Sequence, residues 1–169
     1  PHVMARRQRQ MCIRDRVTPI NSAYASVALM VSATGISNGD TVATEGYYSL
    51  SDGGEMLYTV TNTDLSASVD GGSVIALSGS LYAQAQFPPF YRPEMWGAKG
   101  DNSTASATVN VTAFTNLFAY MVSNNNPVEL NSGTYYLNNS VPMLAPLPFD
   151  GNYADGFYVI NGNGATLQS

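Results

Sequence analysis

Short segments with a two-residue period, separated by glycine turns, constrain the fold of this chain more than any other feature of its sequence. Residues 55–61 and 81–87 place alternate side chains on opposite faces, as half-buried strands do. Asp-Gly and Gly-Gly pairs mark tight turns between several of the segments. Further short strands are expected at residues 41–44, 73–77, 128–130, 134–137 and 157–160, and one more after a turn at 161–164. The sequence therefore predicts a mostly β fold.

Only two segments have helical spacing. The first lies between an expected N-cap, Ser22, and a stop at Gly35. Its apolar face is expected to consist of Tyr24, Val27, Ala28 and Val31. The second is expected to begin at Asn110, as its N-cap, and to end in the Asn-rich turn before Pro127. Its apolar face is expected to consist of Phe114, Leu117, Phe118 and Met121.

Charged residues are scarce and unevenly placed. They make up 11% of the chain, against roughly 25% in an average soluble domain. From residue 17 onward two basic residues, Arg92 and Lys99, stand against eleven acidic ones, a net charge of −9, and histidine and cysteine are absent. This composition argues against a nucleic-acid partner, Ser-His-Asp and Cys-His catalytic sites, and zinc sites. No apolar run approaches the roughly 20 residues that span a bilayer, so no membrane partner is expected.

Residues 1–16 differ in composition from the rest of the chain. They hold five of the seven basic residues, the only histidine (His2) and the only cysteine (Cys12). A basic nucleic-acid arm is one interpretation, and a signal peptide with residues 23–33 as its apolar region is another. The stretch RQRQMCIRDR instead resembles translated sequencing-adapter sequence. We therefore treat residues 1–16 as a non-native or disordered tail, and expect the chain to be cut at its other end as well.

Pro88-Pro89 marks the expected boundary between two folded parts, because proline cannot donate a hydrogen bond to a strand ladder. Residues 17–90 are predicted to form a small β-rich domain. Residues 91–169 are predicted to begin a second domain that contains the longer helix and further short strands.

The order of several short motifs resembles that of a known family. Residues 93–101, PEMWGAKGD, resemble the opening segment of the pectate-lyase-like right-handed β-helix, and residues 131–137, NSGTYYL, with 160–164, INGNG, resemble its next strands and turn. The family's Asp-Asp-Thr helix start is replaced here around Asn110, and Asn102 stands where a third glycine is usual. Earlier motifs resemble the small N-terminal domain of bacteriophage tailspikes: Gly39-Asp40-Thr41-Val42, Gly46-Tyr47-Tyr48, Asp52-Gly53-Gly54, Tyr58-Thr59-Val60 and Asp70-Gly71-Gly72-Ser73-Val74-Ile75.

The resemblance implies a virion-attachment domain in residues 17–90, and a capping helix with the first rungs of a right-handed parallel β-helix in residues 91–169. It implies the N-terminal fragment of a phage tailspike or tail-fibre protein, located in the virion tail and acting at the host cell surface. The partners it implies are two further copies in a homotrimer, a tail or baseplate protein, and a bacterial surface polysaccharide that is bound or degraded. A secreted bacterial pectate-lyase-like lyase or hydrolase and a non-enzymatic β-helix adhesin remain as alternatives.

No catalytic, cofactor-binding or metal-binding residue is predicted. Glu45, Glu94 and Glu129 lie outside turn motifs, but nothing pairs them in the sequence. The aspartates beside glycine are interpreted as turn residues rather than calcium ligands, because no Asp-x-Asp-x-Asp-Gly loop is present. They are Asp40, Asp52, Asp70, Asp101, Asp150 and Asp155.

Aromatic residues are weighed in the same way. Trp96 and the pairs Tyr47-Tyr48 and Tyr135-Tyr136 are candidates for stacking on sugar rings, but packing within strands and interfaces is the favoured interpretation. The resemblance places catalytic residues on later rungs, so this chain is expected to be inactive by itself. Its last strand, near Leu167, is expected to find no partner within the chain.

Deleting residues 1–16 is expected to leave the thermal stability of the protein unchanged within error, because the composition break at Val17 places them outside the folded part. Differential scanning calorimetry of the two forms measures this. A loss of several degrees on deletion would show that the segment packs on the rest of the chain.

Overall fold

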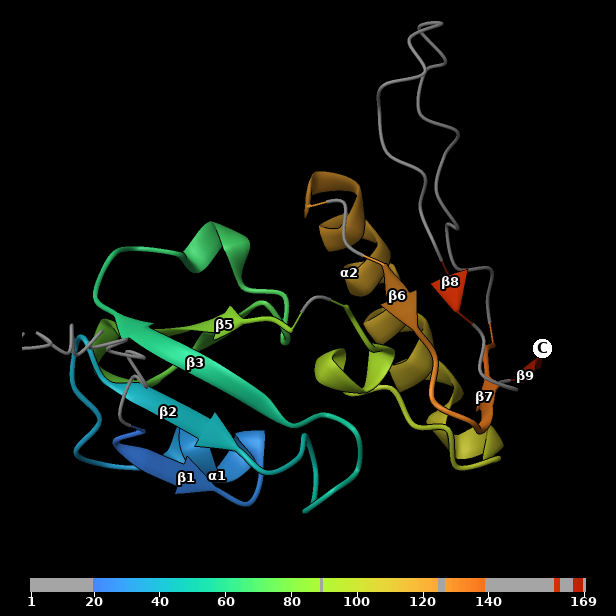
Figure 1. Ribbon diagram of the computed structural model, residues 1–169, viewed down its shortest axis with the longest axis horizontal. Helices are drawn as coiled ribbons and strands as arrows, with labels where there is room; N and C mark the ends of the chain where they lie inside the picture. The colour runs from blue at the N-terminus through green and yellow to red at the C-terminus, as the bar shows by residue number, and fades with distance from the viewer. Residues whose placement is uncertain (1–19, 89, 125–126, 139–159, 162–165, 169) are drawn as a thin grey trace, which may run out of the picture.

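The structure, a computed structural model, has a sheet at the N-terminal side and a long helix with short parallel strands beside it (Figure 1). It describes residues 20–88, 90–124, 127–138, 160–161 and 166–168. The predicted tail at residues 1–16 and the predicted strand residues 157–159 lie outside this part of the chain.

The N-terminal part is a five-stranded sheet with the order β1-β2-β3-β5-β4. Its strands are β1 (Ser22–Tyr24), β2 (Thr41–Thr44), β3 (Met56–Thr61), β4 (Val74–Ala76) and β5 (Tyr82–Gln86). β1 runs parallel to β2, and the other neighbours are antiparallel. Two short 3-10 helices lie on either side of β4 in the chain: η1 (Ser66–Ser68) and η2 (Ser78–Ser80). The four strands predicted between residues 41 and 87 are confirmed, with ends that differ by at most one residue.

The first helix differs from its prediction. Residues 22–24 form strand β1, which pairs with residues 42–44 of β2, so Ser22 is not a helix cap. The backbone N–H of Asn21 donates to the carbonyl of Thr41, which extends this pairing. Hydrogen bonding to a neighbouring strand thus overrides the helical spacing of the apolar residues at this point.

The helix begins only after the strand. α1 (Val27–Ser32) is capped by Ser26, whose Oγ accepts a hydrogen bond from the N–H of Leu29 at 3.3 Å. Val27 and Met30 are its buried residues, whereas Leu29 and Val31 are exposed. Of the predicted apolar face, Val27 is buried and Tyr24 packs against the core from strand β1, whereas Ala28 and Val31 are exposed.

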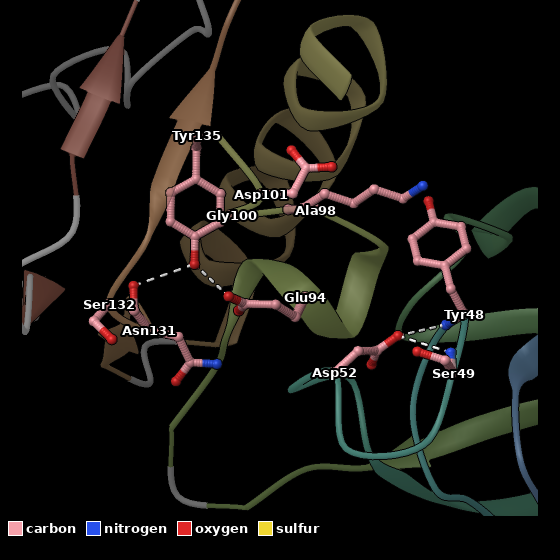
Figure 2. Close-up of a pocket in the computed structure, with 11 residues that line it drawn as sticks. Tyr48, Ser49, Asp52, Glu94, Ala98, Gly100, Asp101, Asn131, Ser132 and Tyr135 are labelled. Carbon is pink, nitrogen blue, oxygen red and sulfur yellow. Dashed lines mark hydrogen bonds between the residues drawn. The ribbon is translucent and has the colours of Figure 1, made fainter. Parts of the chain in front are cut away.

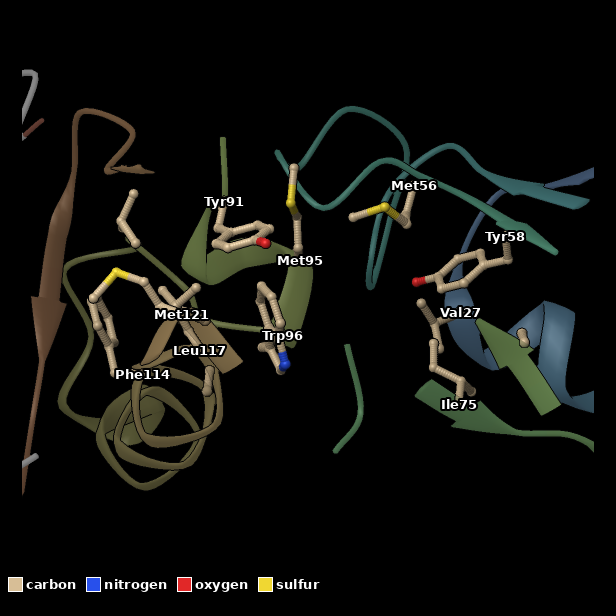
Figure 3. Packing of buried hydrophobic residues seen from close by; sticks show 14 of the residues in the cluster. Val27, Met56, Tyr58, Ile75, Tyr91, Met95, Trp96, Phe114, Leu117 and Met121 are labelled. Carbon is tan, nitrogen blue, oxygen red and sulfur yellow. The ribbon is translucent and has the colours of Figure 1, made fainter. Parts of the chain in front are cut away.

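Alternation along β3 determines which face of the sheet is buried. Met56, Tyr58 and Val60 are buried, and Thr59 between them is exposed. Figure 3 shows Val27 of α1 between the ring of Tyr58 and Ile75 of β4. α1 therefore contributes to the hydrophobic core of the sheet.

The second helix has the predicted apolar face. α2 (Ala107–Asn124) follows a 3-10 turn, η4 (Thr104–Ser106), and packs against η3 (Pro93–Trp96) and strand β7 (Thr134–Tyr136). The four predicted side chains are each at most 5% exposed: Phe114, Leu117, Phe118 and Met121. Figure 3 shows Leu117 and Met121 on the side of α2 that faces Tyr91 and Trp96, whereas the ring of Phe114 lies 5.5 Å from that of Tyr135 on β7.

Asn110 is not the N-cap of this helix. The helical segment begins after Ser103, whose Oγ accepts from the N–H of Ala105, and Asn110 lies one turn inside α2 with no exposed surface. Its side chain accepts from the N–H of Lys99 at 2.7 Å and donates to the carbonyls of Lys99 at 3.0 Å and Tyr136 at 3.1 Å. The amide is thus used to join three segments rather than to end a helix.

Two pairs of parallel strands follow α2. β6 (Val128–Glu129) pairs with β8 (Ile160–Asn161), and β7 pairs with β9 (Thr166–Gln168). Val128 lies opposite Ile160 and Thr134 opposite Thr166, so both pairs join residues 32 positions apart. An identical offset in two parallel pairs is the pattern of a chain that returns over itself with a fixed repeat.

Earlier segments extend both pairs by one layer. Tyr91 forms a parallel bridge to Val128, and Asp101 forms one to Thr134. Three segments are therefore stacked in each of two columns. The described residues do not form a closed β-helix, and β9 has a partner, β7, so the prediction that the last strand is unpaired was wrong.

No helix within the described ranges is long and apolar enough to cross a membrane.

Replacing Leu117 by alanine is expected to cost about 2–5 kcal/mol of folding free energy, because its fully buried side chain would leave a cavity between α2 and η3. Leu50→Ala is the matched control, since Leu50 is 64% exposed and should cost less than about 0.5 kcal/mol. Urea unfolding monitored by fluorescence measures both. Equal effects of the two substitutions would contradict the packing described for α2.

Candidate functional site

A cleft of about 420 Å³ lies between the loop at residues 47–54 of the sheet domain and the segments around η3 and β7 (Figure 2). It mixes carboxylates, hydroxyls, one amide, one ammonium group and two tyrosine rings. Its lining residues are Tyr48, Ser49, Asp52, Glu94, Ala98, Lys99, Gly100, Asp101, Asn131, Ser132 and Tyr135. The cleft joins residues that are far apart in the sequence, and is therefore built by the fold and not by a local motif.

Asp52 holds the loop that forms one wall. Its Oδ1 accepts from the N–H groups of Tyr47 at 2.8 Å and Gly54 at 3.0 Å, and its Oδ2 accepts from those of Tyr48 at 2.7 Å and Ser49 at 3.0 Å. Partial burial opposes ionisation of this carboxyl, but the four backbone donors outweigh it and hold the pKa of Asp52 below its usual value. In the Asp-Gly turn predicted here, the carboxylate of Asp52 therefore holds the loop together through hydrogen bonds to its backbone.

Glu94 lines the cleft and is 5% exposed. The hydroxyl of Tyr135, itself fully buried, donates a hydrogen bond to Glu94 Oε1 (Figure 2). Burial raises the pKa of Glu94, while Tyr135, Arg92 and the nearby side chain of Asn131 act in the opposite direction. Burial and the neighbouring Glu94 also raise the pKa of Tyr135.

The other oxygen of this carboxyl has a different status. Glu94 Oε2 is buried and has no hydrogen-bond partner within the part of the chain that the structure describes. The sequence analysis found no partner for Glu94. Tyr135, which donates to its Oε1, is 41 residues away in the chain, so local sequence patterns could not predict this pair.

Lys99 and Tyr48 form the opposite rim. The ammonium nitrogen of Lys99 lies 4.1 Å from the centre of the Tyr48 ring, and the Tyr48 hydroxyl donates to the carbonyl of Gly97 at 2.9 Å. Gly97 has a φ of 85° and packs against Tyr47, so a side chain here would be strained and would clash. The rim therefore depends on a glycine that lets the two halves of the molecule approach closely.

The two basic residues of the folded part are used differently. Arg92 forms an ion pair with Glu129 at 3.6 Å and lies over the ring of Phe90. Lys99 lies at the cleft rim, and no carboxylate of the described residues is within ion-pair distance of it.

Asp70 connects the sheet to the segments beyond it. Its Oδ2 accepts from the indole N–H of Trp96 at 3.0 Å, and its backbone carbonyl accepts from the side chain of Asn116 at 2.7 Å. The Trp96 ring stacks on Phe87, with centroids 5.1 Å apart and planes 11° apart. Trp96 is only 4% exposed, so the favoured interpretation of this residue as a packing group agrees with its position.

The remaining aspartate and aromatic candidates also have identifiable positions. Asp40 and Asp101 each accept a backbone N–H in a turn, from Ser37 and Ser103 respectively. Asp150 and Asp155 lie outside the described residues, and in the described part no cluster of three or more His, Cys, Asp or Glu side chains suits a metal ion. Of the tyrosine pairs, Tyr135 is buried, Tyr47 and Tyr136 are half-buried, and Tyr48 is 46% exposed.

Several solved structures of similar fold are tailspikes or tailspike-like enzymes. Tailspike protein gp49 of the Acinetobacter baumannii bacteriophage Fri1, a capsular polysaccharide depolymerase, is 19% identical with a TM-score of 0.55, and the match covers 69% of this chain and 20% of that one. WceF from Pantoea stewartii, a glycan biofilm modifying enzyme with a tailspike-like parallel β-helix fold, is 16% identical with a TM-score of 0.54, over 68% of this chain and 16% of WceF. The enzymatically active domain of tailspike protein 2 from bacteriophage CBA120 is 15% identical with a TM-score of 0.51, over 69% and 16%.

These likenesses concern the fold, since the identities lie between 15% and 19%. The chain spans 16–20% of the length of these three structures. No protein-family model matches the chain, and no curated protein sequence matches it.

Asp52→Asn is expected to destabilise the protein by about 1 kcal/mol near neutral pH, because an amide has one accepting oxygen in place of two for the four N–H donors of the loop. The lowered pKa of Asp52 means that its carboxylate stabilises the fold above the pKa of the unfolded chain, and that this stabilisation is lost as the pH falls through the folded value. The difference in unfolding free energy between wild type and variant should therefore be complete near pH 6 and shrink below about pH 4. A difference that does not vary with pH would contradict this role.

Glu94→Gln is expected to be as stable as the wild type or more stable near neutral pH, because it removes the cost of ionising a buried carboxyl. A raised pKa favours the folded state below the ordinary value of 4.5, and this advantage is lost as the pH rises through the folded value. The wild type should therefore lose stability relative to the variant on going from about pH 4 to about pH 7.

Glu45→Gln is the matched control for this comparison, since Glu45 is exposed, and chemical unfolding at the two pH values measures all three proteins. A wild type that gains stability over Glu94→Gln with rising pH would show that the carboxylate is well paired.

Proposed function

We propose that this chain forms the beginning of a tailspike-like protein whose later part binds or degrades a bacterial surface polysaccharide. The observation that carries the proposal is the presence of two columns of parallel-paired segments. Tyr91, Val128 and Ile160 lie in one column, and Asp101, Thr134 and Thr166 lie in the other. In both columns the second and third residues are 32 positions apart in the chain. Parallel strands stacked in this way are the building principle of a β-helix. The similar solved structures are tailspikes and an enzyme with a tailspike-like fold, which supports the same assignment.

In this proposal the parts of the chain have distinct tasks. α2 acts as a cap that covers the first layer of a right-handed β-helix, since its buried face packs against η3 and β7. The sheet formed by residues 22–86 acts as the virion-attachment domain, and the complete protein assembles as a homotrimer in the phage tail. We propose attachment and trimer formation because the order of the sequence motifs resembles that of tailspikes.

Polysaccharide cleavage belongs to a part of the proposed protein outside this chain. Glycoside cleavage needs a paired acid and base on either side of the bond. In the cleft, both oxygens of Asp52 are occupied by backbone donors, and Glu94 is buried against Tyr135. Asp52 is committed to its loop and Asp101 accepts from Ser103 and Ser106, so Glu94 has no second free carboxyl in the cleft as an acid–base partner, which supports the proposal that this chain is inactive by itself.

A bacterial glycan-modifying enzyme is the second candidate. WceF from Pantoea stewartii is described as such an enzyme with a tailspike-like fold, and its TM-score of 0.54 is close to that of the phage protein gp49, 0.55. The two candidates share the fold and the substrate class and differ in where the protein is located. The genes next to it distinguish them: tail or baseplate genes support the first, and glycan-synthesis or sugar-transport genes support the second.

The complete gene product is expected to depolymerise a capsular polysaccharide or lipopolysaccharide O-antigen, and residues 17–169 alone are expected to leave it intact, because no free acid–base pair is present in the cleft. Reducing-end release and the size of the polysaccharide on gel filtration measure cleavage, and light scattering measures the mass of the complete protein. Cleavage by residues 17–169 would refute their proposed inactivity. A complete protein that neither binds nor cleaves any such polysaccharide would refute the proposed function, and a monomeric one would refute the trimer.

A further inference from the structure

The cleft between the sheet and the first parallel strands contains a polar atom that the protein itself does not satisfy. Glu94 Oε2 is buried without a hydrogen-bond partner within the described ranges, although Glu94 Oε1 accepts from Tyr135. A buried polar group without a partner is destabilising, so one that persists calls for a ligand or a bound solvent molecule. Figure 2 shows the Glu94 carboxyl group among the side chains that line the cleft.

The chemistry of this atom restricts the ligand. If Glu94 is ionised, Oε2 needs a donor, and if the proton is on Oε2, that atom needs an acceptor. A hydroxyl group satisfies either state, because it both donates and accepts. Asn131 is half-buried beside this carboxyl and its side chain acts to lower the pKa of Glu94, so a hydroxyl at Oε2 would meet this amide as well.

The other groups of the cleft suit a polyhydroxylated molecule without charge. The ammonium of Lys99, the amide of Asn131 and the hydroxyls of Ser49 and Ser132 line it. The carboxylate of Asp101 lines it too, and its Oδ1 and Oδ2 accept from Ser103 and Ser106. With the carboxylates of Asp52 and Asp101 against one ammonium group, the cleft does not favour an anion.

We propose that this cleft binds one neutral pyranose unit of a glycan, with a ring hydroxyl at Glu94 and a second hydroxyl at Lys99 or Asn131. The volume of about 420 Å³ lies in the range of small-ligand sites and holds a single sugar ring with its water. The site lies at the junction of the sheet and the parallel strands, apart from any depolymerising centre on later rungs. The choice of a glycan as the ligand rests on the proposed function, whereas the cleft and its unpaired oxygen are features of the structure.

Titration of the ¹⁵N-labelled chain with methyl glycosides of glucose, galactose and N-acetylglucosamine, followed by amide chemical shifts, tests this site. Binding in the millimolar range is expected for at least one of the three, with shifts concentrated at Tyr48, Lys99, Gly100 and Ser132. Methyl glucuronide is expected to bind at least threefold more weakly than the corresponding glucoside. Glycerol is the control for a polyol without a ring.

Three variants separate the cleft from the rest of the surface. Ser49→Trp fills the rim and should weaken binding more than tenfold, while Ser78→Trp, at an exposed position outside the cleft, should leave it unchanged within twofold. Glu94→Leu, which removes both oxygens at similar size, should weaken binding about three- to tenfold, the loss of one hydrogen bond to the ring hydroxyl. The amide spectrum of each variant shows that it is folded.

Several results would overturn the inference: no shifts with any glycoside, shifts that lie away from the cleft, or unchanged binding by Ser49→Trp. The proposed function is judged separately, by the depolymerisation assay on the complete protein. A protein that cleaves polysaccharide while its cleft binds no glycoside retains the proposed function and loses this site. A cleft that binds glycosides in a protein without depolymerising activity retains the site.

Discussion

The first layer of a parallel strand stack has no strand above it, and much of this structure is arranged around that constraint. An open layer exposes apolar side chains and unpaired backbone groups. Here Tyr91 and Asp101 bridge to β6 and β7, and α2 lays four buried apolar side chains against the same region. Asn110 fixes the arrangement, because its amide satisfies both backbone groups of Lys99 and one carbonyl of β7 at once.

The junction between the sheet and the stack is held by a few specific contacts. Asp70 staples its own turn through the N–H groups of Gly72, Ser73 and Val74, and also accepts from the indole of Trp96. A Cβ at Gly72 would lie 2.5 Å from the Trp96 ring, so only glycine allows this approach. The carboxylate that shapes the turn through Oδ1 thus also holds Trp96 of η3 through Oδ2. The two parts are therefore coupled, even though the sequence changes character at Pro88-Pro89.

The sequence predicted those elements whose signal is local. The alternation in β3 and β5 and the apolar face of α2 were both correct. Each element buries one side, so its apolar residues recur with the period of a strand or of a helix. The helix expected from Ser22 was wrong, because pairing with β2, some 20 residues away, decides the conformation of residues 22–24. Asn110 was misplaced for a related reason, since its three partners include a carbonyl on β7 that no helix-capping rule considers.

The cleft was beyond such rules altogether. Its central pair, Glu94 and Tyr135, is separated by 41 residues in the chain. The pairing of β7 with β9 likewise joins residues 32 positions apart. Asp52 shows the intermediate case. Its turn was expected from the Asp-Gly-Gly sequence, whereas its place at a cleft wall depends on the position of η3 and β7 on the opposite side. Local chemistry thus predicted the form of each segment, and only the packing of distant segments created the site.

This division bears on how the carboxylates of the chain can act. Asp52 and Asp70 each accept three or more backbone N–H groups, so that the charge of each is balanced by dipoles of its own loop. For Asp52 the backbone donors outweigh partial burial and lower the pKa, so its carboxylate is a poor proton acceptor. Glu94 is the exception among the three, since one oxygen is bonded to Tyr135 and the other to nothing in the described residues. Of these three carboxylates, Glu94 is therefore the one with an oxygen available to hydrogen-bond a ligand at this junction.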